Sequence, residues 1–391
     1  MPSPSLVLLL LATAASAADQ LLFAQSVWRH GDRTPTGTYP SDPYQEEYWG
    51  VPWGELTTRG MKQQFLQGQR LKKEYADKYG LVSAKYDREQ VTIRSANTPR
   101  CLQSGLANTA GFYAGVPPSP PPFTLLPGSP TFPSDVPSWP SNWTPVPIHS
   151  MPADEDRELE PGTNCDRATE LMAERLTRKS FLDFLASHWN LFAQIMEHGG
   201  DTIELEFKTL AHIYQAISIE KGYYNLTLPA WITNDLYNEL EGAVEDALDY
   251  VNGWAGFGHG EDTEILKLRG GFLLREWINN MEAAKGGKEE KYKAYSAHDS
   301  TVGALLYALG AKVDAIGKKN PEYASTVVAE LWKRDDGNYH IMYSDDALHE
   351  LRPITKFVKG CPTDSDFCLL DTFVARSQKY LATVADCNIF G

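Results

Sequence analysis

The 391-residue sequence can bury a large core and form two or three lobes, although one elaborated domain is also compatible with this length. Its 42% hydrophobic and 11% aromatic content is typical of a globular protein and excludes a disordered chain. The formal net charge of −15 argues against a nucleic-acid binder or an anionic-membrane binder, because the long-range field repels both. A small anionic substrate is not excluded, since it responds to a local cluster of cations.

The first 17 residues have the pattern of a signal peptide. Residues 6–11 form an apolar centre too short to span a bilayer, and Ala15-Ser16-Ala17 is a small-x-small cleavage signal. No later stretch reaches transmembrane length, and the last residues offer no membrane anchor. We therefore expect a mature protein that is secreted or lumenal.

An apolar run of strand length, residues 21–28, leads directly into residues 29–35, RHGDRTP. The guanidiniums of Arg29 and Arg33 stay charged and disfavour imidazolium, so we expect a depressed pKa for His30. A neutral imidazole beside fixed positive charge suits attack on an anion that the arginines bind. An isolated Arg-His-Gly is more often a solvated turn, but the full R-H-G-x-R-x-P pattern is far more specific.

The next residues are predicted to complete one strand–helix unit and to form a second one. Residues 54–79 carry an apolar stripe with helical spacing. Residues 90–93 form a short β-rich run that leads to Arg94, and a second helix follows as far as Tyr113. Because the ends of neighbouring strands meet at one edge of a sheet, Arg94 is a candidate third ligand for a phosphate-like anion. An isolated arginine at such a place is otherwise a surface residue.

The middle of the chain changes character twice. Residues 116–147 are rich in proline and predict an extended connector rather than a proline-rich ligand for another domain, with residues 146–149 returning as an edge strand. Residues 165–285 carry mainly helical patterns. The histidines in this region lack the spacing of metal ligands, and no nucleotide-binding or metalloprotease motif is present, so we expect no metal and no cofactor.

A second chemical centre comes late in the chain. Residues 291–297 predict a strand that leads to His298 and Asp299, and a helix follows from Ser300. An isolated His-Asp pair is a weak signal, because Asp299 or Ser300 can simply cap the helix. The pair becomes a stronger candidate because a nucleophilic His30 needs an acid as its partner, and Asp299 at a second strand end would supply that acid.

The five cysteines fit an oxidising compartment. Cys361 and Cys368 are close enough in sequence to close a local loop, and Cys165 could join Cys387 near the end of the chain. Cys101 is then a buried free thiol. This pairing is one of several that five cysteines permit.

Two glycosylation sequons begin at Asn142 and Asn225, and each is a weak signal by itself. The fold class that we expect is a three-layer α/β/α domain with a mainly parallel mixed sheet, plus a smaller, mostly helical inserted lobe. Residues 18–160 and 291–391 would form the α/β core, and residues 161–290 would form the helical lobe.

The motifs at residues 29–35, at Arg94 and at residues 298–301 (HDST) together resemble the histidine acid phosphatase family. The similarity extends over nearly all of the mature chain and is closer to the animal prostatic and lysosomal acid phosphatases than to phytases or phosphoglycerate mutases. The proline-rich segment and the missing membrane anchor depart from the lysosomal pattern. Relatives of this type are often homodimers, so a homodimer is possible.

The resemblance implies a metal-independent acid phosphatase that acts on a small phosphomonoester. His30 would attack phosphorus and form a phosphohistidine, while Asp299 would protonate the leaving alcohol and so favour acid pH. Asp32 would be a structural turn residue. Two alternatives stay open: a secreted pseudoenzyme that binds phosphate esters or proteins, and a mutase of the same superfamily. Four side chains would bind the phosphoryl oxygens: Arg29, Arg33, Arg94 and His298.

Overall fold

The computed structural model describes residues 19–115, 145–200, 207–336, 338–347 and 350–388. Residues 1–17, which are predicted to be a signal peptide, most of the proline-rich segment and Asn142 lie outside the described residues. A seven-stranded mixed sheet forms the centre, with the order β2-β3-β1-β4-β5-β6 and β7 paired to β5. The strands are β1 (Gln20–Arg29), β2 (Val91–Ser95), β3 (Tyr292–Ala297), β4 (Thr326–Lys333), β5 (Tyr339–Ala347), β6 (Glu350–Pro353) and β7 (Cys368–Leu369).

The α/β class and the mixed sheet are confirmed. The parallel pairs are β1 with β3 and β2 with β3, whereas the pairs that involve β4 to β7 are antiparallel. The expected "mainly parallel" description therefore holds for the three strands that lead to the predicted motifs. Residues 146–149 are predicted to form an edge strand. In the structure they form a single parallel bridge, between His149 and Arg94.

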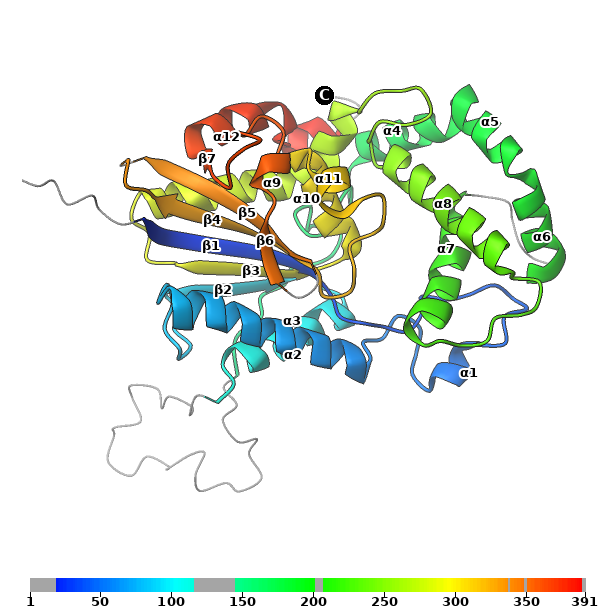
Figure 1. Ribbon diagram of the computed structural model, residues 1–391, viewed down its shortest axis with the longest axis horizontal. Helices are drawn as coiled ribbons and strands as arrows, with labels where there is room; N and C mark the ends of the chain where they lie inside the picture. Colours follow the sequence, from blue (N-terminus) through cyan, green and yellow to red (C-terminus); the bar gives the residue numbers. More distant parts are fainter. Residues whose placement is uncertain (1–18, 116–144, 201–206, 337, 348–349, 389–391) are drawn as a thin grey trace, which may run out of the picture.

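Helices cover both faces of the sheet (Figure 1). Strand β1 is buried on both sides, as expected of a central strand: Phe23 and Val27 belong to one core cluster, and Ala24 and Trp28 to the other. The cluster with Trp28 includes residues of α2 (Thr58–Lys72), η1 (Lys73–Lys78) and α3 (Pro99–Phe112). The cluster with Val27 includes residues of α9 (Thr263–Lys285), α10 (Asp299–Leu309) and α12 (Leu370–Ser377).

A group of helices lies beside the sheet, near its site-bearing end (Figure 1). It contains α4 (Asp166–Thr177), α5 (Lys179–Ser187), α6 (Trp189–Gly199), α7 (Phe207–Ser218), η3 (Ile219–Tyr223) and α8 (Asn234–Val251). Shorter elements are α1 (Glu46–Trp49), α11 (Lys312–Ile316), η4 (Thr355–Phe357), η5 (Gln378–Tyr380) and η6 (Val384–Cys387).

Helix α9, assigned to the helical lobe from its sequence pattern, packs on the sheet instead. Leu273 and Trp277 belong to the same core cluster as Val27 of β1, and the Trp277 carbonyl accepts a hydrogen bond of 2.9 Å from Gln25. A helix with this much buried apolar surface needs the sheet to cover it. The packing therefore places α9 with the α/β layers, and the expected boundary at residue 290 does not describe it.

Candidate active site

The three parallel strands end at one edge and bring the predicted motifs together. Arg29 of β1 is level with Ala297 of β3, and the His30 backbone amide donates a 2.8 Å hydrogen bond to the Ala297 carbonyl. His298, the residue after β3, places its ring 5.7 Å from the ring of His30, edge to face. Two segments more than 250 positions apart in the sequence thus form one site.

The turn after β1 is fixed by a close backbone contact. A Cβ added to Gly31 would lie 2.3 Å from the Gly60 carbonyl oxygen, and one added to Gly60 would lie 2.2 Å from the Asp32 oxygen. Only glycine fits at either place. Asp32 is buried and its carboxylate accepts hydrogen bonds from Thr57 and Tyr224, so it supports this turn as a structural residue.

The ring of His30 has a defined tautomer. Nδ1 lies 2.8 Å from the Gly31 carbonyl oxygen, which can only accept, so Nδ1 carries the proton and Nε2 keeps its lone pair. Burial, followed by the charges of Arg29, Arg33 and Arg100, lowers the pKa of His30 well below 6.5. His30 is therefore a neutral imidazole with a free nitrogen, as the flanking arginines predict.

Arg29 connects the turn to the predicted acid. Its Nη2 lies 3.2 Å from Asp299 Oδ2, its Nη1 donates to the Pro321 carbonyl at 2.7 Å, and its guanidinium lies 4.0 Å from the Tyr323 ring centroid. Burial would raise the pKa of Asp299, but the charges of Arg29, Arg33 and His298 hold it below 3.8. Asp299 is therefore ionised when no anion occupies the site.

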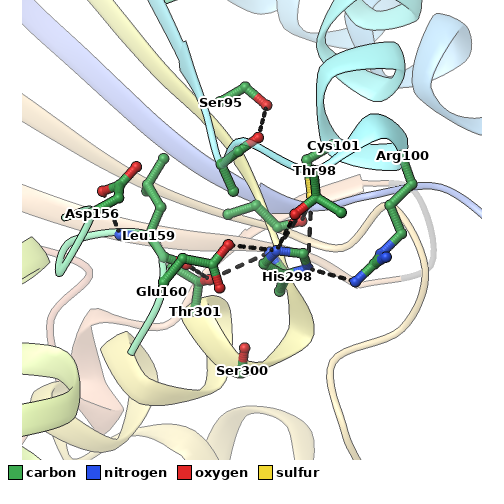
Figure 2. Close-up of polar contacts among 12 residues, drawn as sticks. Ser95, Thr98, Arg100, Cys101, Asp156, Leu159, Glu160, His298, Ser300 and Thr301 are labelled. Atoms are coloured by element: carbon green, nitrogen blue, oxygen red, sulfur yellow. Dashed lines mark hydrogen bonds and ion pairs between the residues drawn. The ribbon is translucent and has the colours of Figure 1, made fainter. Parts of the chain in front are cut away.

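His298 has contacts that were not foreseen from its motif (Figure 2). Its Nε2 lies 3.1 Å from Glu160 Oε1, its Nδ1 lies 3.5 Å from Arg100 Nη2, and the Cys101 sulfur lies 3.7 Å from both ring nitrogens. Burial disfavours charge on this ring, but the hydrogen bonds with Cys101 and Glu160 outweigh it and raise the pKa of His298 to about 9. His298 is a cation in the same site where His30 is neutral.

Arg94, the predicted third anion ligand, does not join this group. Its Nη2 lies 2.9 Å from the buried carboxylate of Asp156 and 3.8 Å from Glu158. Arg94 is level with Tyr295 in the sheet, three residues before His298 and hence roughly 10 Å back along the strand. The position of Arg94 inside the strand, rather than after it, explains why the prediction fails.

The arginine that reaches the site is Arg100, in the first turn of α3. A helix that starts at the carboxyl end of a strand directs its first turn into the site, and this signal was available in the sequence. Glu160 gave no such signal, because it follows the proline-rich segment and has no regular periodicity around it. Asp156 holds the loop that carries Glu160 in place by accepting hydrogen bonds from Arg94 and from the Leu159 amide, at 2.9 and 3.1 Å.

A cavity of about 1070 Å³ extends from Arg29 and Asp299 into the space between α9, α10 and the helices α4, α7 and α8. Its walls are mixed: apolar side chains such as Leu176 and Phe181 line it together with hydroxyl and charged groups such as Tyr214, Glu241 and Lys312. The cavity reaches the acid side of the site, where a leaving group would lie.

Both expected disulfides are formed, Cys165 with Cys387 and Cys361 with Cys368, and Cys101 is a buried free thiol. The sequon residue Asn225 is exposed at the surface. Within the described ranges, no helix is long and apolar enough to cross a bilayer.

A neutral histidine among three arginines, at the carboxyl edge of an α/β sheet, defines an enzyme that binds and attacks an anionic group. Comparisons with known proteins show to which family of such enzymes the chain belongs. A model of the histidine phosphatase superfamily (branch 2) matches residues 20–344. Lysosomal acid phosphatase of Xenopus laevis is 31% identical over 379 residues, which cover 96% of this chain and 80% of that protein. Prostatic acid phosphatase of Bos taurus is 32% identical over 361 residues, covering 91% and 84%. The chain belongs to branch 2 of the histidine phosphatase superfamily.

Solved structures agree on the fold. The apo form of Hafnia alvei phytase aligns with a TM-score of 0.64 and 15% identity, covering 95% of this chain and 99% of that one. Phytase of Citrobacter braakii aligns with a TM-score of 0.64 and 16% identity, covering 95% and 100%. The predicted resemblance to the animal prostatic and lysosomal acid phosphatases is confirmed at the level of sequence.

Proposed function

We propose that this chain hydrolyses phosphate monoesters through a covalent phosphohistidine. The observation that carries the proposal is the state of His30: its Nδ1 is held by the Gly31 carbonyl, and its free Nε2 belongs to a buried, neutral ring among cations. Such a nitrogen is a nucleophile for an electrophile that arrives with negative charge. The acid phosphatase relatives support the same reaction.

In the first step, the phosphoryl oxygens bind to Arg29, Arg33, Arg100 and His298, whose charges offset the negative charge of the transition state. Nε2 of His30 forms a bond to phosphorus while the bond from phosphorus to the leaving oxygen breaks. That oxygen takes a proton from Asp299 and departs as the alcohol. Arg100 replaces Arg94 in this set, since Arg94 is bound to Asp156.

In the second step, the carboxylate of Asp299 accepts a proton from water, and the water oxygen attacks phosphorus. The bond between phosphorus and Nε2 breaks, and phosphate leaves with the neutral ring restored. Over the two steps Asp299 regains the proton that it donated, and His30 regains the electron pair that it shared with phosphorus. The positive charge that stabilises the transition state comes from side chains of the protein. We therefore propose that hydrolysis needs no metal ion.

The acid pH optimum has a physical reason in this site. Asp299 is ionised in the empty site, so its proton must arrive with the substrate. A phosphomonoester is a monoanion below its second pKa of about 6 and can pass that proton to the carboxylate. The negative charge of the bound group also offsets the arginines that hold the Asp299 pKa down. Activity should fall as the pH rises above about 6.

We also propose that the protein is secreted or lumenal and that it is glycosylated. Two disulfides and the relationship to lysosomal and prostatic acid phosphatases support a secreted or lumenal protein. The exposed Asn225 is a suitable acceptor for glycosylation. A homodimer stays a prediction.

The decisive experiment is direct capture of the intermediate. The protein is mixed with labelled p-nitrophenyl phosphate, quenched in alkali, which preserves phosphohistidine, and digested for mass analysis. We expect label on His30, hydrolysis in the presence of chelator, and no label in His30→Ala. A pseudoenzyme would bind the ester without releasing p-nitrophenol, and a mutase would transfer the label to a second substrate rather than to water.

A further inference from the structure

Arg269 is a cation of the cavity wall that has no acid partner among the residues that the structure describes. It lies on α9 where this helix crosses α10 closely, because a Cβ added to the adjacent Gly270 would lie 2.2 Å from the Ala304 oxygen. Its Nη1 donates to the sulfur of Met172 at 3.4 Å. In the part of the chain that the structure describes, Tyr307 is the only titratable group that acts on its charge.

This isolation is costly for a half-buried guanidinium. Burial lowers the pKa of Arg269 to about 10, so it is still a cation at acid and neutral pH. Nearby cations are compensated: Arg175 lies 3.7 Å from Asp262, and Lys312 lies 2.6 Å from Asp249. A buried charge without a partner destabilises a folded protein, because the desolvation of the charge is not offset by an opposite charge.

The acidic residues of the cavity lie elsewhere. Glu241 and Glu245 line the wall formed by α8, and the charges that act on Glu245 come from Lys312, Lys319 and neighbouring acids. Neither glutamate is among the groups that affect Arg269. Among the described residues, the end of the cavity near Arg269 is therefore positive, and no carboxylate there pairs with the guanidinium.

One face of α10 connects Arg269 to the catalytic acid. Asp299, Ala304 and Tyr307 of this helix all line the cavity. At a rise of 1.5 Å per residue, Ala304 and Tyr307 lie roughly 8 and 12 Å along the axis from Asp299. A leaving group that departs past Asp299 and extends by this length would reach the guanidinium.

We propose that Arg269 binds a second anionic group, a phosphate or a carboxylate, on the leaving group of the substrate. The preferred substrates are then phosphate monoesters whose second anionic group lies roughly 8 to 12 Å from the scissile phosphorus. This inference rests on the proposed phosphatase function and deepens it. Arg269 acts through binding and takes no part in proton or phosphoryl transfer.

The test compares hexane-1,6-diol bisphosphate with hexyl phosphate, which share the scissile group and the spacer. The readout is the ratio of their kcat/KM values within one protein, because this ratio cancels differences in active fraction. We expect a ratio of about 10 or more in the wild-type protein, in line with a charge-assisted contact. Ethane-1,2-diol bisphosphate, which is too short to reach Arg269, should show no such advantage.

Substitution then assigns the effect to the residue. Arg269→Gln should bring the ratio for the six-carbon pair to about 2, the statistical value for a substrate with two equivalent phosphates, and Arg269→Lys should retain part of the excess. Arg167→Gln is the matched control, since it removes the same charge from α4 outside the cavity, where Arg167 pairs with Glu264 and Glu170. Replacing the distal phosphate of the substrate by a carboxylate shows which anion the subsite prefers.

A wild-type ratio at or below the statistical value of about 2 overturns this inference while leaving the phosphatase proposal intact, and so does an unchanged ratio in Arg269→Gln. The wild-type ratio is informative even if the variant does not fold. No phosphate release from any of these esters, or from p-nitrophenyl phosphate, overturns the proposed function instead.

Discussion

Glu160 Oε1 lies 3.1 Å from His298 Nε2, which joins a loop residue to a candidate phosphate ligand 138 positions away (Figure 2). This contact helps to raise the pKa of His298 to about 9, so that His298 carries positive charge throughout the acid and neutral range. In the proposed mechanism, Glu160 would support substrate binding by keeping His298 protonated.

The first prediction concerns Glu160→Gln, which keeps the shape of the side chain and removes its charge. The pKa of His298 should fall, because burial then outweighs the remaining contacts. His298 would lose its proton as the pH rises through the neutral range, and KM for p-nitrophenyl phosphate should increase about tenfold between pH 5 and pH 7.5, with kcat changing less. Glu158→Gln, on the same loop but facing Arg94, is the control. Parallel KM profiles for Glu160→Gln and the wild type would exclude this role.

The second prediction separates Arg94 from Arg100. Arg100→Met should lower kcat/KM by at least about 100-fold, because it removes a cation from the phosphoryl site, with little loss of stability. Arg94→Met leaves the buried Asp156 without its partner and should lower the free energy of unfolding by about 3 kcal/mol. Urea denaturation and steady-state kinetics of both variants decide the assignment. The opposite pattern would return Arg94 to the site.

The third prediction tests Asp299 as the acid. Asp299→Asn cannot donate a proton to the leaving oxygen, so hydrolysis of alkyl phosphates should slow by about 10² to 10⁴. p-Nitrophenolate needs less protonation, and its phosphate ester should be affected much less. The measurement is kcat across a series of leaving groups of increasing pKa. Equal losses for alkyl and aryl phosphates would show that Asp299 has another role.

The fourth prediction concerns the stability of the protein against pH. Glu220 is fully buried in η3, and burial together with the neighbouring Asp42 raises its pKa to about 9 from 4.5. The pKa of Glu220 is higher in the folded than in the unfolded protein. The contribution of Glu220 to the free energy of unfolding is therefore fully present below pH 4.5 and is lost as the pH rises toward 9. Glu220→Gln should therefore raise the Tm at pH 8 by about 3 °C or more, and by less at pH 5. The exposed Glu239→Gln is the control, and an equal Tm change at both pH values would contradict the prediction.

The elements that define the site were predictable because they have strong local signals. The β1 run, the RHGDRTP turn and the strand before His298 combine buried apolar runs with unusual charged residues, and the structure places them as expected. Sequence alone could not tell on which side of the last strand residue Arg94 lies. Arg94 lies inside the strand, level with Tyr295, and its guanidinium pairs with Asp156 instead of reaching the site.

The remaining features depend on contacts between distant parts of the chain. The pattern of α9 shows that it is apolar but not whether a sheet or other helices cover it. Glu160 reaches His298 because Asp156 holds its loop, and no periodicity reports such a long-range ion pair. The cavity around Arg269 likewise exists only after α9 and α10 have packed together.

The hydrogen bond from His30 to the Gly31 carbonyl also bears on the fate of the proposed intermediate. A carboxylate in that place would make the imidazole more basic and would hold the phosphoryl group more tightly. A peptide oxygen fixes the tautomer without adding charge, so the nitrogen that captures phosphorus can also release it. In the proposed mechanism, the turn that positions His30 would thereby let the covalent adduct break down instead of inactivating the enzyme.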